Sequence, residues 1–120
     1  MVKRIEKTRI MHRAVEHNGI VFLGGIIADD VTVGMYGQVQ QICKKLDAVL
    51  AMAGTDKTKL LSAQLFVTKM SAKEEMNAAW LEWLDGNDYP TRATIGVADL
   101  GDPANTDCTR RSRSSGMTAR

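Results

Sequence analysis

The chain has 120 residues, which fits one domain, since domains commonly span roughly 100–200 residues. Hydrophobic residues make up 44% of it and charged residues 25%, a globular composition that excludes a disordered chain. No apolar run approaches the roughly 20 residues that a membrane span needs, and the charged N-terminus has no apolar signal core. We therefore predict a cytoplasmic protein with no membrane partner.

The net charge of +2 is distributed unevenly along the chain. Residues 1–103 carry 12 Lys and Arg against 13 Asp and Glu, whereas residues 104–120 carry four Arg against one Asp. A body with a net charge of −1 lacks the basic field of nucleic-acid-binding proteins, so we predict no nucleic-acid partner. Neither the two cysteines nor the two histidines have the spacing of metal ligands, so we also predict no metal site.

The dipeptide Asn18-Gly19 separates two apolar runs, which is a strong signal for a β-hairpin. It predicts strands at about 13–17 and 20–25. The second strand ends at Gly24-Gly25, where the absence of side chains would let another backbone or a ligand come close.

Apolar residues at steps of three and four predict a long helix from about Val33 to Ala53. Gly54 follows at the position that favours a left-handed C-terminal cap. Lys44 and Lys45 are expected on the outer face of this helix.

The second half of the chain predicts a strand over residues 60–69, a helix from Ser71 and a strand over residues 91–97. Ser71 and Glu74 have the spacing of a capping box. Alternation in the last strand places Ala93, Ile95 and Val97 on one face, which we expect to meet the core, and Arg92 and Thr94 on the other.

The expected order of strand, strand, helix, strand, helix, strand indicates an α+β domain, with two helices packed on one face of a mixed sheet. Residues 1–103 form this domain. Residues 104–120 show no periodicity of either kind and read as an atypical basic polar tail, which we expect to lie outside the sheet.

Arg92 is the residue most suited to binding chemistry. It lies in a short strand of small and apolar residues, directly after Tyr89-Pro90-Thr91. An ordinary surface ion pair would explain it. Alternatively, its guanidinium is a rigid fork for a carboxylate, because arginine stays charged and donates two parallel hydrogen bonds. Thr94 points the same way.

The segments AVEHNGIVFLGG, LDAVLAMAGTDKTKLLSAQLFVT, MNAAW and YPTRATIGVA together resemble the Rid (YjgF-type) family of reactive-intermediate deaminases. The resemblance covers about residues 4–103. Its most specific parts are AMAG followed by a lysine-rich connector and strand, and the Pro-x-Arg element that ends at Arg92.

The resemblance implies a chorismate-mutase-like fold and a homotrimer with ligand clefts between subunits. It implies hydrolysis of 2-imino or enamine acids to 2-oxo acids and ammonia, with no metal or organic cofactor. In such sites Arg92 would hold the substrate carboxylate, while Gly25, Asn77 and Thr94 would line the ligand.

Two positions depart from the family pattern. A tyrosine that lines the cleft of many members falls near Ala14, and the closing strand that carries a water-positioning glutamate has no counterpart in the sequence of the tail. We therefore expect an imine or enamine deaminase. The alternative is a non-catalytic trimeric protein that binds small 2-oxo acids or related carboxylates through the same Arg92.

Overall fold

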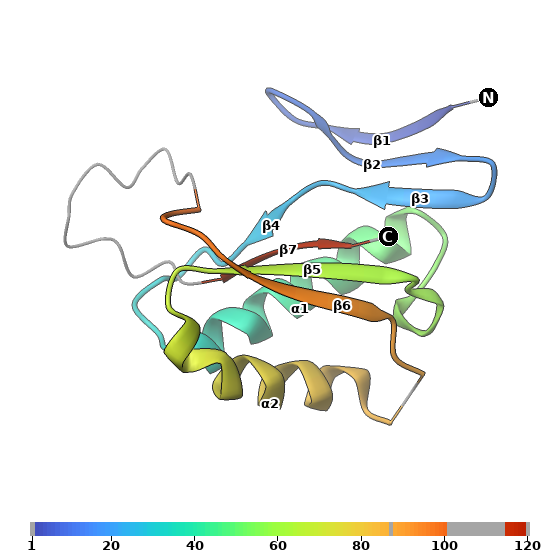
Figure 1. The fold of residues 1–120 in the computed structure, drawn as a ribbon. Coiled ribbons are helices and arrows are strands. Elements are labelled where there is room, and N and C mark those ends of the chain that lie inside the picture. Colours follow the sequence, from blue (N-terminus) through green and yellow to red (C-terminus); the bar gives the residue numbers. More distant parts are fainter. Residues whose placement is uncertain (1, 87, 101–114, 120) are drawn as a thin grey trace.

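The computed structural model describes residues 2–86, 88–100 and 115–119 (Figure 1). Along the chain these residues form β1 (Lys3–Lys7), β2 (His12–His17), β3 (Ile20–Leu23), β4 (Ile26–Ile27), α1 (Met35–Met52), β5 (Ser62–Val67), α2 (Lys73–Leu84), β6 (Thr91–Gly96) and β7 (Ser115–Ala119). Short 3₁₀ turns at Lys57–Lys59 and Met70–Ala72 precede β5 and α2.

The N-terminal strands form an antiparallel sheet in the order β1-β2-β3. The turn between β2 and β3 has positive φ at Asn18 (53°) and Gly19 (78°), so the hairpin prediction is confirmed. An additional edge strand, β1, precedes the hairpin and was not predicted from the sequence. The second predicted strand, at about residues 20–25, ends earlier, at Leu23, and a further short strand, β4, follows Gly24-Gly25.

The second sheet has the order β4-β7-β5-β6. β5 and β6 are parallel and are joined through α2, while β7 is antiparallel to both β4 and β5. Both helices lie on one side of the strands (Figure 1). The prediction of an α+β, chorismate-mutase-like fold with a mixed sheet and two helices on one face is confirmed.

The expectation that residues 104–120 stay outside the sheet is wrong for β7. β7 lies between β4 and β5, with Met117 opposite both Ile26 and Leu65. Strand pairing is carried by backbone N–H and C=O groups, so a segment without an apolar face can fill a gap between two strand edges if it holds no proline. The predicted boundary between residues 103 and 104 lies outside the described residues.

The core lies between the sheets and the helices. Its best buried side chains come from α1, β5 and α2, and include Ile42, Leu46, Leu65, Met76 and Leu84. Neither helix of the described chain has the length and apolar character that crossing a bilayer requires.

The helix ends show one correct and one wrong prediction. Gly54 (φ 77°) follows α1 in the left-handed conformation, and the amides of Gly54 and Thr55 donate to the carbonyls of Ala51 and Leu50, as expected for a C-terminal cap. The capping box at Ser71 does not form, because a 3₁₀ turn precedes α2 and its N-cap is Ala72, with no side-chain cap.

Candidate functional site

The register between β5 and β6 sets the direction of the proposed site residues. Arg92 lies beside Ala63 and Thr94 beside Leu65. Neighbouring residues in register share a face of the sheet. Because Ala63 and Leu65 are buried beneath the helices, Arg92 and Thr94 are on the helix-covered face, in the strand at the end of the sheet order.

The predicted faces of β6 are therefore reversed. Ala93 and Ile95 were expected to meet the core, but they lie beside Gln64 and Phe66 on the face opposite the helices, which we call the open face. Ile95 is 37% exposed there. Arg92 and Thr94 do share a face, as expected, but it is the face that α2 covers.

Asn77 lies on α2 and Thr94 on β6, the strand that follows this helix in the chain. The methyl group of Met70 is 3.4 Å from the point that a Cβ on Gly96 would occupy, so the turn that leads into α2 adjoins the end of β6.

Both residues carry a buried polar atom without a hydrogen bond. The Oδ1 atom of Asn77 and the Oγ1 atom of Thr94 have no partner among the described residues. Most buried polar groups in folded proteins are hydrogen-bonded, so each such group needs an explanation, such as a ligand or an ordered water molecule. One of these atoms belongs to β6 and the other to α2.

The Arg92 side chain is exposed and makes no ion pair with any residue that the structure describes. The ordinary surface ion pair that would explain this arginine is thus not formed with those residues. Its five N–H donors are available for a planar anion.

Gly25 is not brought to this group within one chain. It lies just before β4, at the other end of the sheet order from β6, with β7 and β5 in between. At roughly 4.8 Å per strand, this separates it from Arg92 by well over 10 Å. A Cβ on Gly25 would meet nothing within 4 Å, whereas one on Gly24 would lie 2.9 Å from the Met11 methyl. A side chain at Gly24 would thus displace only the flexible end of Met11, whereas Gly25 presents an open backbone.

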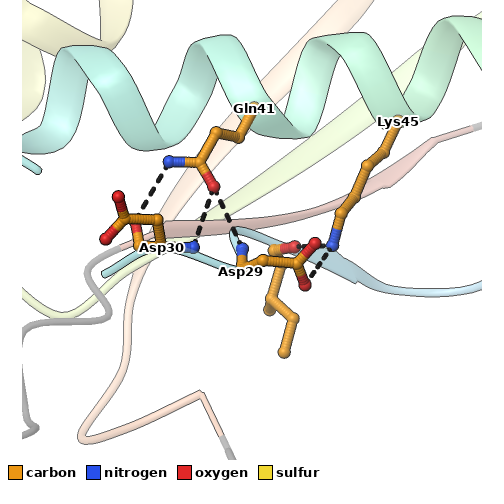
Figure 2. A network of polar contacts seen from close by, with 5 residues as sticks. Asp29, Asp30, Gln41 and Lys45 are labelled. Carbon is orange, nitrogen blue, oxygen red and sulfur yellow. Dashed lines mark hydrogen bonds and ion pairs between the residues drawn. The ribbon is translucent and has the colours of Figure 1, made fainter. Parts of the chain in front are cut away.

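A polar network holds the segment after β4 against α1 (Figure 2). Gln41 Oε1 accepts hydrogen bonds from the amides of Asp29 (3.1 Å) and Asp30 (3.0 Å), and its Nε2 donates to the Asp30 carbonyl (3.0 Å). Lys45 Nζ donates to the Ile27 carbonyl (2.9 Å) and to Asp29 Oδ1 (2.7 Å). The network fixes the strand that follows Gly25.

Sequence reasoning missed these two anchors. Lys45 was expected on the outer face of the helix, but it is half-buried and binds a strand carbonyl. A polar residue four positions earlier, Gln41, was the available signal, because residues four apart lie on one face of a helix.

Ala14, at the position of the family tyrosine, is completely buried and faces the core. Within the described chain, no three His, Cys, Asp or Glu side chains gather in a group that could hold a metal ion. Trp80 is buried in the core, and Trp83 donates through Nε1 to Asp47 (3.1 Å), so this pair serves packing.

Known proteins resemble this chain over almost its whole length. The family model described as Endoribonuclease L-PSP matches residues 2–106. A RutC family protein of Haemophilus ducreyi is 36% identical over 103 residues, covering 86% of this chain and 87% of its own. A RutC family protein of Haemophilus influenzae is 30% identical and covers 85% and 88%.

Solved structures show the same fold. NMB1025 from Neisseria meningitidis, a member of the YjgF protein family, has a TM-score of 0.86 at 24% identity and covers 99% of this chain and 92% of its own. YyfA from Yersinia pestis, of the Rid protein family, has a TM-score of 0.85 at 24% identity and covers 99% and 97%.

Proposed function

This chain belongs to the Rid (YjgF) family, and we propose that it hydrolyses reactive 2-imino or enamine acids to 2-oxo acids and ammonia. In this reaction water adds to the carbon of the C=N bond, and the resulting carbinolamine loses ammonia. The imine is already electrophilic, so the protein needs only to orient it, bind its carboxylate and direct one water molecule. We expect this work to be done in the cytoplasm and without a cofactor.

The observation that carries the proposal is that Arg92 makes no ion pair with the described residues and shares its face of β6 with Thr94, whose buried Oγ1 atom has no hydrogen-bond partner among them. The Oδ1 atom of Asn77 on α2 is a second buried atom without a described partner. Arg92 would bind the substrate carboxylate through two parallel hydrogen bonds. The Thr94 hydroxyl both donates and accepts, whereas Asn77 Oδ1 only accepts. In the free protein neither atom has a hydrogen-bond partner among the described residues. The two atoms are therefore suited to hold the attacking water and the N–H of the imine.

The alternative is a protein that binds 2-oxo acids or related carboxylates without turnover. One observation favours it. β7 runs where a closing strand of the sheet would lie, yet its sequence, SGMTA, holds no carboxylate that could position water. An RNA-directed activity, which the description of the family model names, has less support, because the body of the chain has no net positive charge.

We further propose that the working unit is a homotrimer with the site between subunits. Arg92 and Gly25 lie at opposite ends of the sheet order, so one ligand can touch both only if they come from different chains. The open face also carries the apolar side chains of Phe66 and Ile95, which a small domain needs to cover.

The direct test is an assay of 2-imino acids generated in place by an amino-acid oxidase. Loss of imine, trapped as a semicarbazone, and release of ammonia should be faster with the protein than without it. Titration with 2-oxobutanoate by calorimetry separates the alternatives. Binding without faster hydrolysis supports the binding protein. If the protein neither binds 2-oxobutanoate nor speeds hydrolysis, both functions are contradicted.

A subunit-mixing experiment tests the shared site. Arg92→Ala removes the half of the shared site that one subunit supplies, and Gly25→Val obstructs the half that its neighbour supplies. Within its own chain, Gly25 has space for the added side chain. Each variant alone should be inactive. After unfolding and refolding of an equal mixture, about a quarter of the sites should combine both wild-type halves and regain activity. No recovery from variants that still form trimers would place the site within one chain.

A further inference from the structure

A cavity between the two helices has none of the residues assigned above to ligand binding in its lining. Its volume is about 310 Å³, and all of its lining residues belong to α1 or α2. Small-molecule sites in proteins begin at roughly this size. Asn77 is also on α2, but it precedes the lining residue Ala79 by two positions, and residues two apart do not share a face of a helix.

The floor of this cavity is apolar. Cys43 on α1 and Ala79 on α2 are each 3% exposed, and the half-buried Trp83 adds an indole ring to the lining. Trp83 Nε1 donates to Asp47 Oδ2 (3.1 Å), which ties the ring to the opposite helix. Such a floor is suited to an apolar group of a ligand.

Each helix also contributes one carboxylate to the lining, Asp47 from α1 and Glu82 from α2. Asp47 accepts the hydrogen bond from Trp83, and Glu82 Oε2 accepts one from the Tyr36 hydroxyl, so both have uncharged donors. Neither makes an ion pair with a residue that the structure describes. Because an ionised carboxylate has about four acceptor positions, each can still bind a cation.

The same cavity is lined by donors on α1. Gln40 and Lys44 are four residues apart, so they share a face of the helix, about 6 Å from one another along its axis. Within the described part of the chain, neither side chain makes an ion pair or a hydrogen bond. An ammonium group and an amide N–H are the partners that a carboxylate requires.

The cavity opens to solvent on the side of the helices. Its four polar residues, Gln40, Lys44, Asp47 and Glu82, are exposed. Both helices lie on one side of the strands (Figure 1), whereas the open face lies on the other. A trimer that forms through the open face would therefore leave the cavity accessible.

We propose that this cavity, which we call the interhelix cavity, binds a free α-amino acid with an apolar side chain. The ammonium group of the ligand would donate its three N–H bonds to Asp47 and Glu82. The carboxylate would accept from Lys44 and Gln40, and the side chain would lie on the apolar floor. A zwitterion satisfies groups of both signs in one cavity, whereas an amine or a carboxylate alone leaves one set without a partner. This inference does not depend on the proposed deaminase activity.

An NMR titration of the full-length protein with L-leucine tests the proposal. The signal of the Trp83 Nε1–H group, identified by its absence in Trp83→Phe, should shift and saturate with a dissociation constant below about 10 mM. Two ligands are matched to leucine. 3-Methylbutylamine lacks its carboxylate and 4-methylpentanoate lacks its ammonium group, so each should bind about fivefold more weakly or less.

Matched variants test the named contacts. Glu82→Gln and Asp47→Asn remove a charge but keep an oxygen that can accept the existing hydrogen bond, and Lys44→Met removes the ammonium group. Each should weaken leucine binding about fivefold or more and leave the urea midpoint unchanged. Glu74→Gln is the control, because Glu74 is an exposed glutamate on α2 that does not line the cavity. It should bind leucine as the unsubstituted protein does.

The titration also has to separate this cavity from the proposed deaminase site, since Arg92 would bind the carboxylate of leucine too. Leucine should therefore still shift the Trp83 signal in Arg92→Ala. Conversely, Glu82→Gln should leave the binding of 2-oxobutanoate unchanged. The two sites are then distinguished by two variants with opposite effects.

Three results would overturn the proposal. The first is a Trp83 signal that does not shift and saturate at about 10 mM leucine. The second is equal binding of leucine and 4-methylpentanoate, or equal binding of leucine by the unsubstituted protein, Glu82→Gln and Asp47→Asn. The third is loss of leucine binding in Arg92→Ala, which would assign the ligand to the proposed deaminase site.

Discussion

Ala63 and Arg92 are register partners in the parallel pair of β5 and β6, so their side chains leave the sheet on the same face. Ala63 is 1% exposed beneath the helices, whereas Arg92, in the last strand of the sheet order, is exposed. β6 pairs with β5 from Thr91 to Gly96, which gives Arg92 a rigid base. A guanidinium placed in this way can bind a planar anion at the sheet edge with little loss of backbone freedom.

We predict that Arg92→Ala abolishes both imine hydrolysis and 2-oxobutanoate binding, and that Arg92→Lys weakens them at least tenfold. Lysine keeps the charge but loses the second parallel hydrogen bond, which is worth about 1.5–3 kcal/mol when a charge is involved. Ammonia release and calorimetry provide the measurement. Light scattering should show the same assembly as for the unsubstituted protein.

Arg4→Ala is the matched control for Arg92, because Arg4 is an exposed arginine on β1, which belongs to the other sheet. It should leave turnover and binding unchanged. Equal loss in both variants would mean a general effect of surface charge, and unchanged activity in Arg92→Ala would remove the site assignment.

Thr94→Val should separate function from stability. The substitution replaces a buried hydroxyl that has no partner among the described residues by a methyl group of similar shape. Removing an unsatisfied buried polar group recovers its desolvation cost, about 1–3 kcal/mol. We therefore expect an unchanged or higher urea midpoint together with weaker ligand binding and slower hydrolysis. A clear loss of stability would show that the hydroxyl has a structural partner.

Local signals in the sequence were sufficient for the hairpin, both helices and the grouping of Arg92 with Thr94. The Asn18-Gly19 turn and the helical steps of three and four are properties of neighbouring residues. The face of β6 could not be predicted, because it depends on which residue of β5 lies beside Arg92. Ile95 and Phe66 make the open face apolar too, so alternation alone favoured the wrong side.

The position of β7 in the sheet could not be predicted for a different reason. The prediction relied on side-chain alternation, which the tail lacks, whereas the position between β4 and β5 is defined by backbone groups of strands far apart in the sequence. The separation of Gly25 from Arg92 could not be predicted either, because it follows from the order of the strands in the sheet and not from the residues within each strand.

β7 can be tested by Thr118→Pro. Thr118 lies opposite Gln64, in a strand with a neighbour on each side. Proline removes the N–H and is tolerated almost only on edge strands, so we expect a loss of several kcal/mol in the free energy of unfolding. Urea denaturation provides the measurement. Thr118→Ala keeps the donor and should cost less than about 1 kcal/mol. Equal stability of the two variants would show that β7 does not pair in solution.

Cys43 offers a test of the core by pH. It is 3% exposed on α1, and burial, followed by the charge of Asp47, raises the pKa of its thiol from 9.0 to about 12. The folded chain therefore keeps this thiol protonated between pH 9 and 12, whereas the unfolded chain loses the proton. Deprotonation then favours the unfolded state, so this contribution to stability is fully present below pH 9 and declines as the pH rises toward 12.

The measurement compares the Cys108→Ser protein, which keeps one thiol, with the same protein carrying Cys43→Ala. The first should lose free energy of unfolding between pH 9 and 11 faster than the second. At pH 8 its thiol should react with a disulfide reagent only when the chain opens, because the thiolate is the nucleophile and is almost absent in the folded state. Fast labelling at pH 8, or identical pH dependence of the two proteins, would show that α1 does not bury Cys43 against α2.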